Sequence, residues 1–242
     1  MKTARYLIMA AIASLSFSSC YVRISKEGKK ELREKLEIRE LMREVVYSED
    51  DPQVYSPGSF DALDCSGGMD VTFIQRDGEP QVLVFGTHRS RDSIVVENKD
   101  GRLRIYYGNK LGFAYTFDES VTIYSPGVEE ITNNGSGDLL LKGPYSGSSL
   151  TIKSNGSGDV IIEDCSLDGP LSISNRGSGD VEMKVNAGET TISNNGSGDI
   201  SAKGKVGDTK INNFGSGDVY VSKLEASSMD VNSKGSGEVV TR

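Results

Sequence analysis

The tetrapeptide Gly135-Ser-Gly-Asp138 recurs along the second half of this 242-residue chain and decides its fold. It begins again at residues 156, 177, 196 and 215, and Gly-Ser-Gly-Glu begins at residue 235. The motifs are 19 to 21 residues apart, and together they hold twelve of the 28 glycines. A period near 20 residues is typical of stacked supersecondary units, each too small to bury its own apolar face.

Each motif is followed by an alternation of apolar and variable residues, as in Leu139/Leu141 and Val160/Ile162. A period of two with one apolar face predicts a strand. A second strand closes each unit and begins at residue 150, 171, 190, 209 or 229. Nine residues always separate this start from the next motif acid, whereas 10 to 12 separate the acid from the following second strand. The motif is therefore a fixed corner, and the other connection tolerates insertions.

These units predict an all-β fold, a right-handed parallel β-helix with coils of about 20 residues over residues 131–242. A β-sandwich with recurring turns is the alternative, but it would not naturally preserve the nine-residue offset. Residues 55–130 form an N-terminal β region, because short β-branched or aromatic runs alternate there with turn signals. The expected strands are 60–64, 69–74, 81–85, 93–96, 102–107 and 120–124.

We expect the corner residues to have structural roles. The glycines suit a turn that needs positive φ, and the polar residue two places before each motif can form a hydrogen-bonded ladder with its equivalents. This column comprises Asn133, Ser154, Asn175, Asn194, Asn213 and Ser233. The turn residues are Gly135, Gly137, Asp138, Gly156, Gly158, Asp159, Gly177, Gly179, Asp180, Gly196, Gly198, Asp199, Gly215, Gly217, Asp218, Gly235, Gly237 and Glu238.

The six motif acids fall in register and would repel one another unless they are neutralised or hydrogen-bonded. In one interpretation each acid accepts hydrogen bonds from N–H groups of its own corner. In the other, adjacent acids share Ca²⁺, which prefers oxygen ligands. The denser glycine pattern of calcium-binding nonapeptide repeats is missing, so we favour the turn and expect no bound metal.

The N-terminus predicts export. Lys2 and Arg5 precede an apolar run from Tyr6 to Phe17, which is shorter than the roughly 20 residues that span a bilayer. Ser18 and Ser19 then lead into Cys20, where a lipoprotein signal places its lipidated residue. An ordinary signal peptide with a chance cysteine is the alternative. We expect residues 1–19 to be a lipoprotein signal peptide and Cys20 to carry a membrane anchor.

Residues 20–54 are rich in both charges and are expected to form a helical spacer, with the helix over 23–46. A partner-binding or self-associating helix is the alternative. Further along, Phe113, Tyr115 and Phe117 alternate with small residues and form a possible contact patch if they are exposed rather than part of the core.

Composition excludes several function classes. The net charge of −8 makes nucleic acid an unsuitable partner, because phosphate binding needs a basic stripe. With His88 as its single histidine, the chain cannot form most hydrolase active sites. Acid–base catalysis also needs acidic groups in different environments, which a repeated acid does not provide. No cofactor motif is present. An exported compartment permits a disulfide between Cys65 and Cys165, but we expect two buried free thiols.

The chain resembles the putative auto-transporter adhesin family with a head GIN domain. The resemblance covers about residues 55–242 and rests on the Gly-Ser-Gly-Asp repeat and on two further stretches. These stretches are Phe60-Asp-Ala-Leu-Asp-Cys-Ser-Gly-Gly-Met-Asp-Val-Thr72 and Val121-Thr-Ile-Tyr-Ser-Pro126. Members of the family are exported bacterial proteins, often lipoproteins. The resemblance implies a β-helical fold and a cell-envelope location, and it supplies no catalytic residues.

We therefore expect a non-catalytic lipoprotein of the cell envelope, anchored at the outer membrane through Cys20. It would act as an adhesin or binding module that presents its β-helical surface to a glycan or protein. A structural lipoprotein that faces the periplasm and a glycan-active β-helix enzyme are the alternatives. No capping helix follows Val239-Val240, so weak self-association through the C-terminal coil is also expected.

Overall fold

The computed structural model of the protein describes residues 52–86, 91–108 and 119–242, which belong to one compact unit, Ser48–Arg242. Four features expected from the sequence lie outside these ranges. They are the signal peptide, Cys20, the helix over 23–46, and the contact patch of Phe113, Tyr115 and Phe117.

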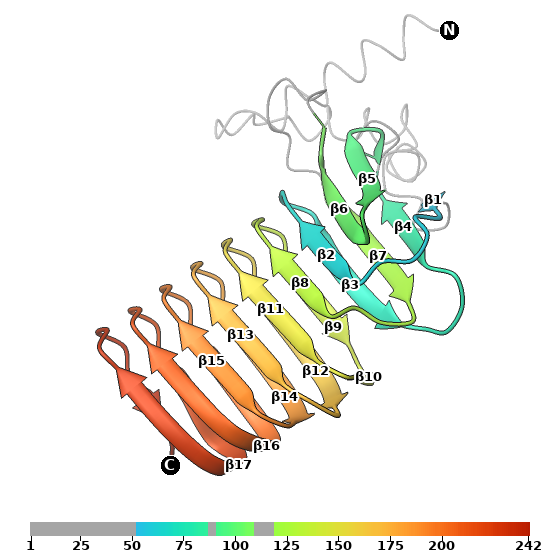
Figure 1. The fold of residues 1–242 in the computed structure, drawn as a ribbon. Coiled ribbons are helices and arrows are strands. Elements are labelled where there is room, and N and C mark those ends of the chain that lie inside the picture. Colours follow the sequence, from blue (N-terminus) through green and yellow to red (C-terminus); the bar gives the residue numbers. More distant parts are fainter. Residues whose placement is uncertain (1–51, 87–90, 109–118) are drawn as a thin grey trace, which may run out of the picture. The chain divides into compact units, whose positions relative to one another are not determined.

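The described elements are strands throughout the solenoid (Figure 1). The first nine are β1 (Gln53–Tyr55), β2 (Ala62–Cys65), β3 (Asp70–Gln75), β4 (Gln81–Phe85), β5 (Ile94–Lys99), β6 (Arg102–Tyr107), β7 (Ser120–Ser125), β8 (Glu130–Asn133) and β9 (Leu139–Lys142). The others are β10 (Tyr145–Gly147), β11 (Leu150–Ser154), β12 (Val160–Leu167), β13 (Leu171–Asn175), β14 (Val181–Ala187), β15 (Thr190–Asn194), β16 (Ile200–Asn213), β17 (Val219–Ser233) and β18 (Val239–Val240).

Equivalent strands of successive coils pair in parallel and build the solenoid. One row runs β6–β2–β8–β11–β13–β15 and continues through the C-terminal halves of β16 and β17. The row that follows the corners runs β7–β3–β9–β12–β14 and continues through the N-terminal halves of β16 and β17 to β18. The all-β fold of stacked parallel coils is thus confirmed, and the β-sandwich alternative is wrong.

The stacking begins before the first Gly-Ser-Gly-Asp motif. Strands β2 and β3 pair in parallel with β8 and β9, so that Cys65 lies beside Asn133 and Val71 beside Leu139. The connection between β2 and β3 contains Gly67. This glycine occupies the place that Gly135 occupies one coil later. This coil turns at a corner whose sequence departs from the repeat.

Antiparallel strands cover the N-terminal end of the solenoid. Strand β5 pairs with β6 as a hairpin, in which Asp100 and Gly101 have φ values of 53° and 77°. Strand β4 pairs antiparallel with β7, and β1 pairs with β4. Because β4 and β5 run opposite to the coil strands with which they pair, they end the parallel stacking and protect its edge.

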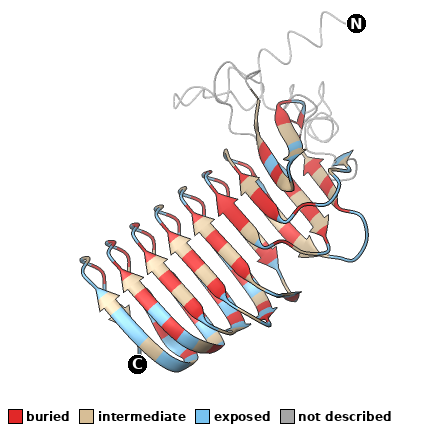
Figure 2. Ribbon diagram, in the orientation of Figure 1, coloured by how far each residue is buried: buried red, intermediate tan, exposed pale blue. Residues whose placement is uncertain are grey.

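The core lies inside the coils and follows the alternation expected from the sequence. The residues at the first and third positions after each acid are at most 3% exposed from Leu139 to Val221. In the second strands the equivalent positions are equally buried, and Ile152, Ile192 and Ile211 are fully enclosed. Figure 2 shows this alternation as regular bands. In the last coil, by contrast, Val231 is 42% exposed.

Differences in coil length are absorbed on one side of the solenoid, as the sequence indicates. The register between β12 and β14 shifts between Ile162 and Cys165, and that between β16 and β17 shifts between Ser201 and Lys203. Both shifts lie after the motif acid in the sequence, on the side where the sequence predicts insertions. The corner side has no insertion from Asn133 to Glu238, so its residues stay aligned.

The two cysteines of the described region are free and buried, as expected. Cys65 is in β2 and Cys165 is in β12. Burial raises the pKa of both thiols to about 12, so they remain protonated at neutral pH. They behave as small apolar residues of the core.

The prediction that the motif glycines need positive φ is wrong. Among the described glycines, those with positive φ are Gly58, Gly67, Gly78, Gly86, Gly101 and Gly204. The motif glycines are required because successive corners approach closely. A Cβ at Gly158 would overlap the carbonyl oxygen of Gly137, and a Cβ at Gly177 would overlap that of Gly156. The constraint therefore lies between coils rather than within the turn.

A methyl group at this position tests the explanation. We expect Gly158→Ala to push two coils apart and to cost at least about 1–3 kcal/mol, as overpacking does. For a chain of this size, that lowers the melting temperature by several degrees. Ser157→Ala changes an exposed neighbour in the same corner and serves as the control, with an effect within about 0.5 kcal/mol. Equal melting curves for the two variants, measured by circular dichroism, would contradict the proposed clash.

Candidate binding groove

The corners present three columns of exposed or half-buried side chains along the solenoid, and their loops form one row in Figure 1. The outer column is formed by the residue before each motif, and it comprises Asn134, Asn155, Arg176, Asn195, Phe214 and Lys234. The serine column comprises Ser136, Ser157, Ser178, Ser197, Ser216 and Ser236. The acid column comprises Asp70, Asp138, Asp159, Asp180, Asp199, Asp218 and Glu238.

Buried asparagines hold the corners in shape. Asn175 accepts a hydrogen bond from the N–H of Gly177, and its Nδ2 donates to the carbonyls of Gly179 and Gly198. It therefore fastens its own corner and the next one together. The prediction that the side chains of this column bond to one another is wrong. The asparagine amides donate instead to the buried carbonyls of the corners, which need a donor.

Main-chain N–H groups of each coil donate hydrogen bonds to the acid column of the preceding coil. Asp159 Oδ1 accepts the N–H of Asp180 at 2.8 Å, and Asp180 Oδ1 accepts that of Asp199 at 2.7 Å. The same bond recurs from Asp70 to Glu238 at 2.7–2.9 Å. The structural role of the carboxylates agrees with the favoured interpretation, but the donor belongs to the next coil rather than to the acid's own corner. Stacking places that N–H directly beside the carboxylate.

One acid shows the electrostatic effect of these bonds. The pKa of Asp218 is lowered because its carboxylate accepts the N–H of Glu238 and the hydroxyl of Tyr220. The same contact raises the pKa of Tyr220. A lowered carboxyl pKa stabilises the fold above about pH 4, where the unfolded group is ionised. This stabilisation is lost as the pH falls through the folded pKa.

A groove of about 580 Å³ runs along the corners between the outer column and the serine column. Its lining residues are Asn155, Gly156, Ser157, Arg176, Gly177, Ser178, Asn195, Gly196, Ser197, Phe214, Gly215, Ser216 and Ser236. They come from five successive corners, so the groove is about 20 Å long at a coil spacing of about 4.8 Å. The glycines between the two columns have no side chains and form its floor.

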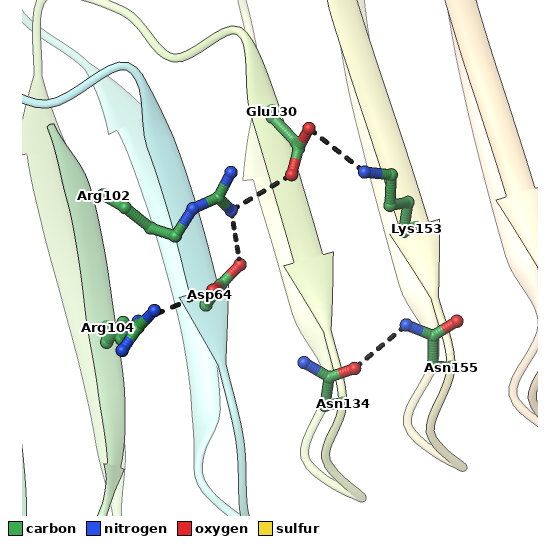
Figure 3. Close-up of polar contacts among 7 residues, drawn as sticks. All are labelled: Asp64, Arg102, Arg104, Glu130, Asn134, Lys153 and Asn155. Atoms are coloured by element: carbon green, nitrogen blue, oxygen red, sulfur yellow. Dashed lines mark hydrogen bonds and ion pairs between the residues drawn. The ribbon is translucent and has the colours of Figure 1, made fainter. Parts of the chain in front are cut away.

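The groove side chains are available to a ligand. Phe214 is 44% exposed, which is unusual for a phenylalanine within so polar a surface. Arg176 is exposed, and no carboxylate of the described region pairs with it. The amide of Asn155 is held in one orientation because its Nδ2 donates to Asn134 Oδ1 at 2.9 Å (Figure 3). Its own Oδ1 remains open to an incoming donor.

An ion-pair network lies on the sheet face beside the first corners, as Figure 3 shows. Arg102 pairs with Asp64 and Glu130, and Glu130 also pairs with Lys153. The bond to Lys153 and that to Arg102 lower the pKa of Glu130, and the bond to Glu130 raises the pKa of Arg102. Arg104 lies 3.9 Å from Asp64 as a third cation, and both acids are paired across strands β6, β2, β8 and β11, so this network stabilises the coils and is a poor ligand site.

The outer column was not predicted from the sequence. The sequence feature that could have revealed it is the variable residue before each constant motif, where Asn, Arg, Phe and Lys occupy equivalent places. Asp70 was also missed as the first acid, because its corner lacks the Gly-Ser-Gly sequence. Its signal is the alternation of Val71 and Phe73 directly after it.

Within residues 52–86, 91–108 and 119–242, no group of three or more His, Cys, Asp or Glu side chains is arranged to hold a metal ion. In the same part of the chain, no helix is both long and apolar enough to serve as a membrane span.

Comparison with known proteins gives one family and several related folds. A family model described as "Putative auto-transporter adhesin, head GIN domain" matches residues 59–242. A putative adhesin from Bacteroides fragilis is 20% identical, with a TM-score of 0.63, and the match covers 78% of this chain and 95% of that one. A putative adhesin from Parabacteroides distasonis is 21% identical, with a TM-score of 0.70 and coverage of 78% and 80%.

A structure from Parabacteroides distasonis described as a putative lipid binding protein is 20% identical, with a TM-score of 0.54. The match covers 78% of this chain and 96% of that one. No curated protein matches the chain. At these identities the likeness to solved structures shows the fold.

The acid column yields a test by substitution. Asp180→Ala removes the acceptor for the N–H of Asp199 and should destabilise the protein by about 1 kcal/mol. Asp180→Asn keeps an oxygen acceptor and removes one charge from the column, so we expect a smaller loss or none. Asp168→Ala, at an exposed acid outside the column, is the control. Thermal melts in which the alanine and asparagine variants of Asp180 are equally stable would contradict the bonding role.

Proposed function

Since the chain belongs to the family of putative auto-transporter adhesins with a head GIN domain, we propose that it is a non-catalytic binding protein of the cell envelope. The groove along the corners is the binding site in this proposal. Lipidation at Cys20 would anchor the chain to the outer membrane.

The observation that carries this proposal is the contrast between the interior and the surface of each corner. Inside, the buried asparagines and the glycines repeat with little change, as in Asn175, Asn194 and Asn213. Outside, the outer column changes from Asn155 to Arg176 to Phe214 at equivalent places. Varied side chains held at a fixed spacing on a rigid support are suited to recognition.

A role without catalysis is supported by the bonding of the corner acids. General acid–base chemistry needs carboxyl groups in different environments, so that one is protonated while another is ionised. The carboxylates of Asp138, Asp159, Asp180 and Asp199 each accept the same main-chain bond from the next coil. Such uniform groups are suited to a scaffold.

The groove proposal is tested on a printed array of glycans and extracellular matrix proteins. We expect the purified chain to bind at least one class of probe, and the double variant Arg176→Ala/Phe214→Ala to lose that binding. The double variant Lys210→Ala/Tyr220→Ala removes one exposed cation and one exposed aromatic ring outside the groove, so it should bind as the wild type does. No binding to any probe, or equal binding by both double variants, would contradict the proposal.

The anchor is tested separately in cells. We expect the wild-type chain to sediment with membranes and to incorporate labelled fatty acid, whereas Cys20→Ser should do neither. Protease added to intact cells should cleave the wild-type chain, because an adhesin must face outward. Protection from protease in intact cells, with cleavage after lysis, would instead support the alternative of a structural lipoprotein that faces the periplasm.

A further inference from the structure

We propose that the groove binds a neutral glycan chain laid along the solenoid axis, an inference that rests on the proposed binding function. In this arrangement Phe214 stacks against the face of a sugar ring. Arg176, Asn155 and the serine column form hydrogen bonds to sugar hydroxyls. The inference follows from the polarity, the charge and the backbone bonding of the groove.

The polar groups of the groove suit a ligand rich in hydroxyl groups. Hydroxyls both donate and accept, and the groove offers serine hydroxyls, amide groups and a guanidinium along one line. No side-chain hydrogen bond within the described residues engages Ser157, Ser178 or Ser197. Their hydroxyls face solvent at successive coils, about 4.8 Å apart, and can bond to a chain that follows the axis.

The exposed ring of Phe214 indicates a sugar rather than a purely polar ligand. The C–H-bearing face of a pyranose ring is weakly apolar, and it packs against an aromatic face while its hydroxyls point outward to polar groups. Phe214 lies in the groove lining one coil from Asn195 and two coils from Arg176. An apolar surface is therefore available within reach of the hydrogen-bonding groups.

The charge of the corner favours a neutral chain. The acid column runs beside the serine column over the same coils, so a row of carboxylates that includes Asp159, Asp180 and Asp199 lies next to the groove without lining it. The one cationic side chain in the groove lining is Arg176. Repulsion from the neighbouring acid column opposes uronate-rich or sulfated glycans, since a polyanion in the groove would pass beside several carboxylates while the lining offers it one guanidinium.

A peptide fits the groove less well for two reasons. The corner backbone is already bonded between coils, because Ser178 N–H donates to Gly156 O and Ser197 N–H donates to Gly177 O at 3.0 Å. The floor therefore offers no free edge for an added strand. The lining also lacks the apolar pockets that usually anchor peptide side chains, since Phe214 is its one large apolar residue.

The test measures binding of the purified chain to soluble glycans by isothermal titration calorimetry and affinity electrophoresis. The neutral probes are dextran, mannan and a β-glucan, the anionic probes are polygalacturonate and heparin, and the protein probes are fibronectin and collagen. We expect a neutral probe to bind with an affinity that changes little with salt concentration, because uncharged contacts are not screened.

Matched variants locate the contact. We expect Phe214→Ala and Arg176→Ala each to weaken binding of the neutral probe at least about tenfold, as loss of a central contact does. Phe214→Trp keeps an aromatic face and should retain binding. Tyr220→Ala removes an equally exposed ring outside the groove and should leave binding unchanged. Both groove positions are exposed, so melting curves near that of the wild type will show that the variants fold.

The other outcomes separate this inference from the proposed function. Binding of an anionic glycan or of a protein probe that the groove variants abolish would overturn the neutral-glycan inference and leave the binding function standing. Neutral-glycan binding that the groove variants do not change would overturn the assignment to the groove. If the chain binds none of the three probe classes, both the inference and the proposed function are contradicted.

Discussion

The close approach of successive corner backbones is the constraint on which the rest of the structure depends. A side chain at Gly156, Gly158 or Gly177 would overlap a carbonyl oxygen of the coil before it. With glycine at these places, Ser157 N–H reaches Gly135 O, and Ser178 N–H reaches Gly156 O. The main chain of each corner is thereby bonded to the next, and the strands on either side are brought into the same register.

This constraint divides the corner into two kinds of position. Positions between the coils vary little, because the glycines allow the corners to approach closely while the buried asparagines and the acids accept or donate hydrogen bonds across coils; serine replaces asparagine only at Ser154 and Ser233. Positions that face away from the stack do not have to bond to a neighbouring coil, although Asn155 bonds to Asn134 and the exposed serine column stays constant. The outer column belongs to this second kind, and in Arg176 and Phe214 it carries the cation and the ring of the groove. Variation beside a constant motif is therefore the feature that points to recognition.

The sequence was sufficient to predict the coils, because periodicity records burial directly. The alternation in Leu139/Leu141 and the nine-residue offset identified the strands and the side that accepts insertions. The reason for the glycines, the partners of Asn175 and the donor to Asp180 were not predictable in the same way. Each depends on a contact between residues about one coil apart, and sequence spacing alone does not give the distance between two stacked corners.

Amide hydrogen exchange measures whether the bonds between coils make the corners a rigid support. The N–H groups of Asp159, Asp180 and Asp199 lie in surface turns, yet each donates to a carboxylate of the preceding coil. If the corners are rigid, these amides exchange as slowly as those of the buried strands β13 and β15. Exchange as fast as that of an unstructured loop would contradict this rigidity.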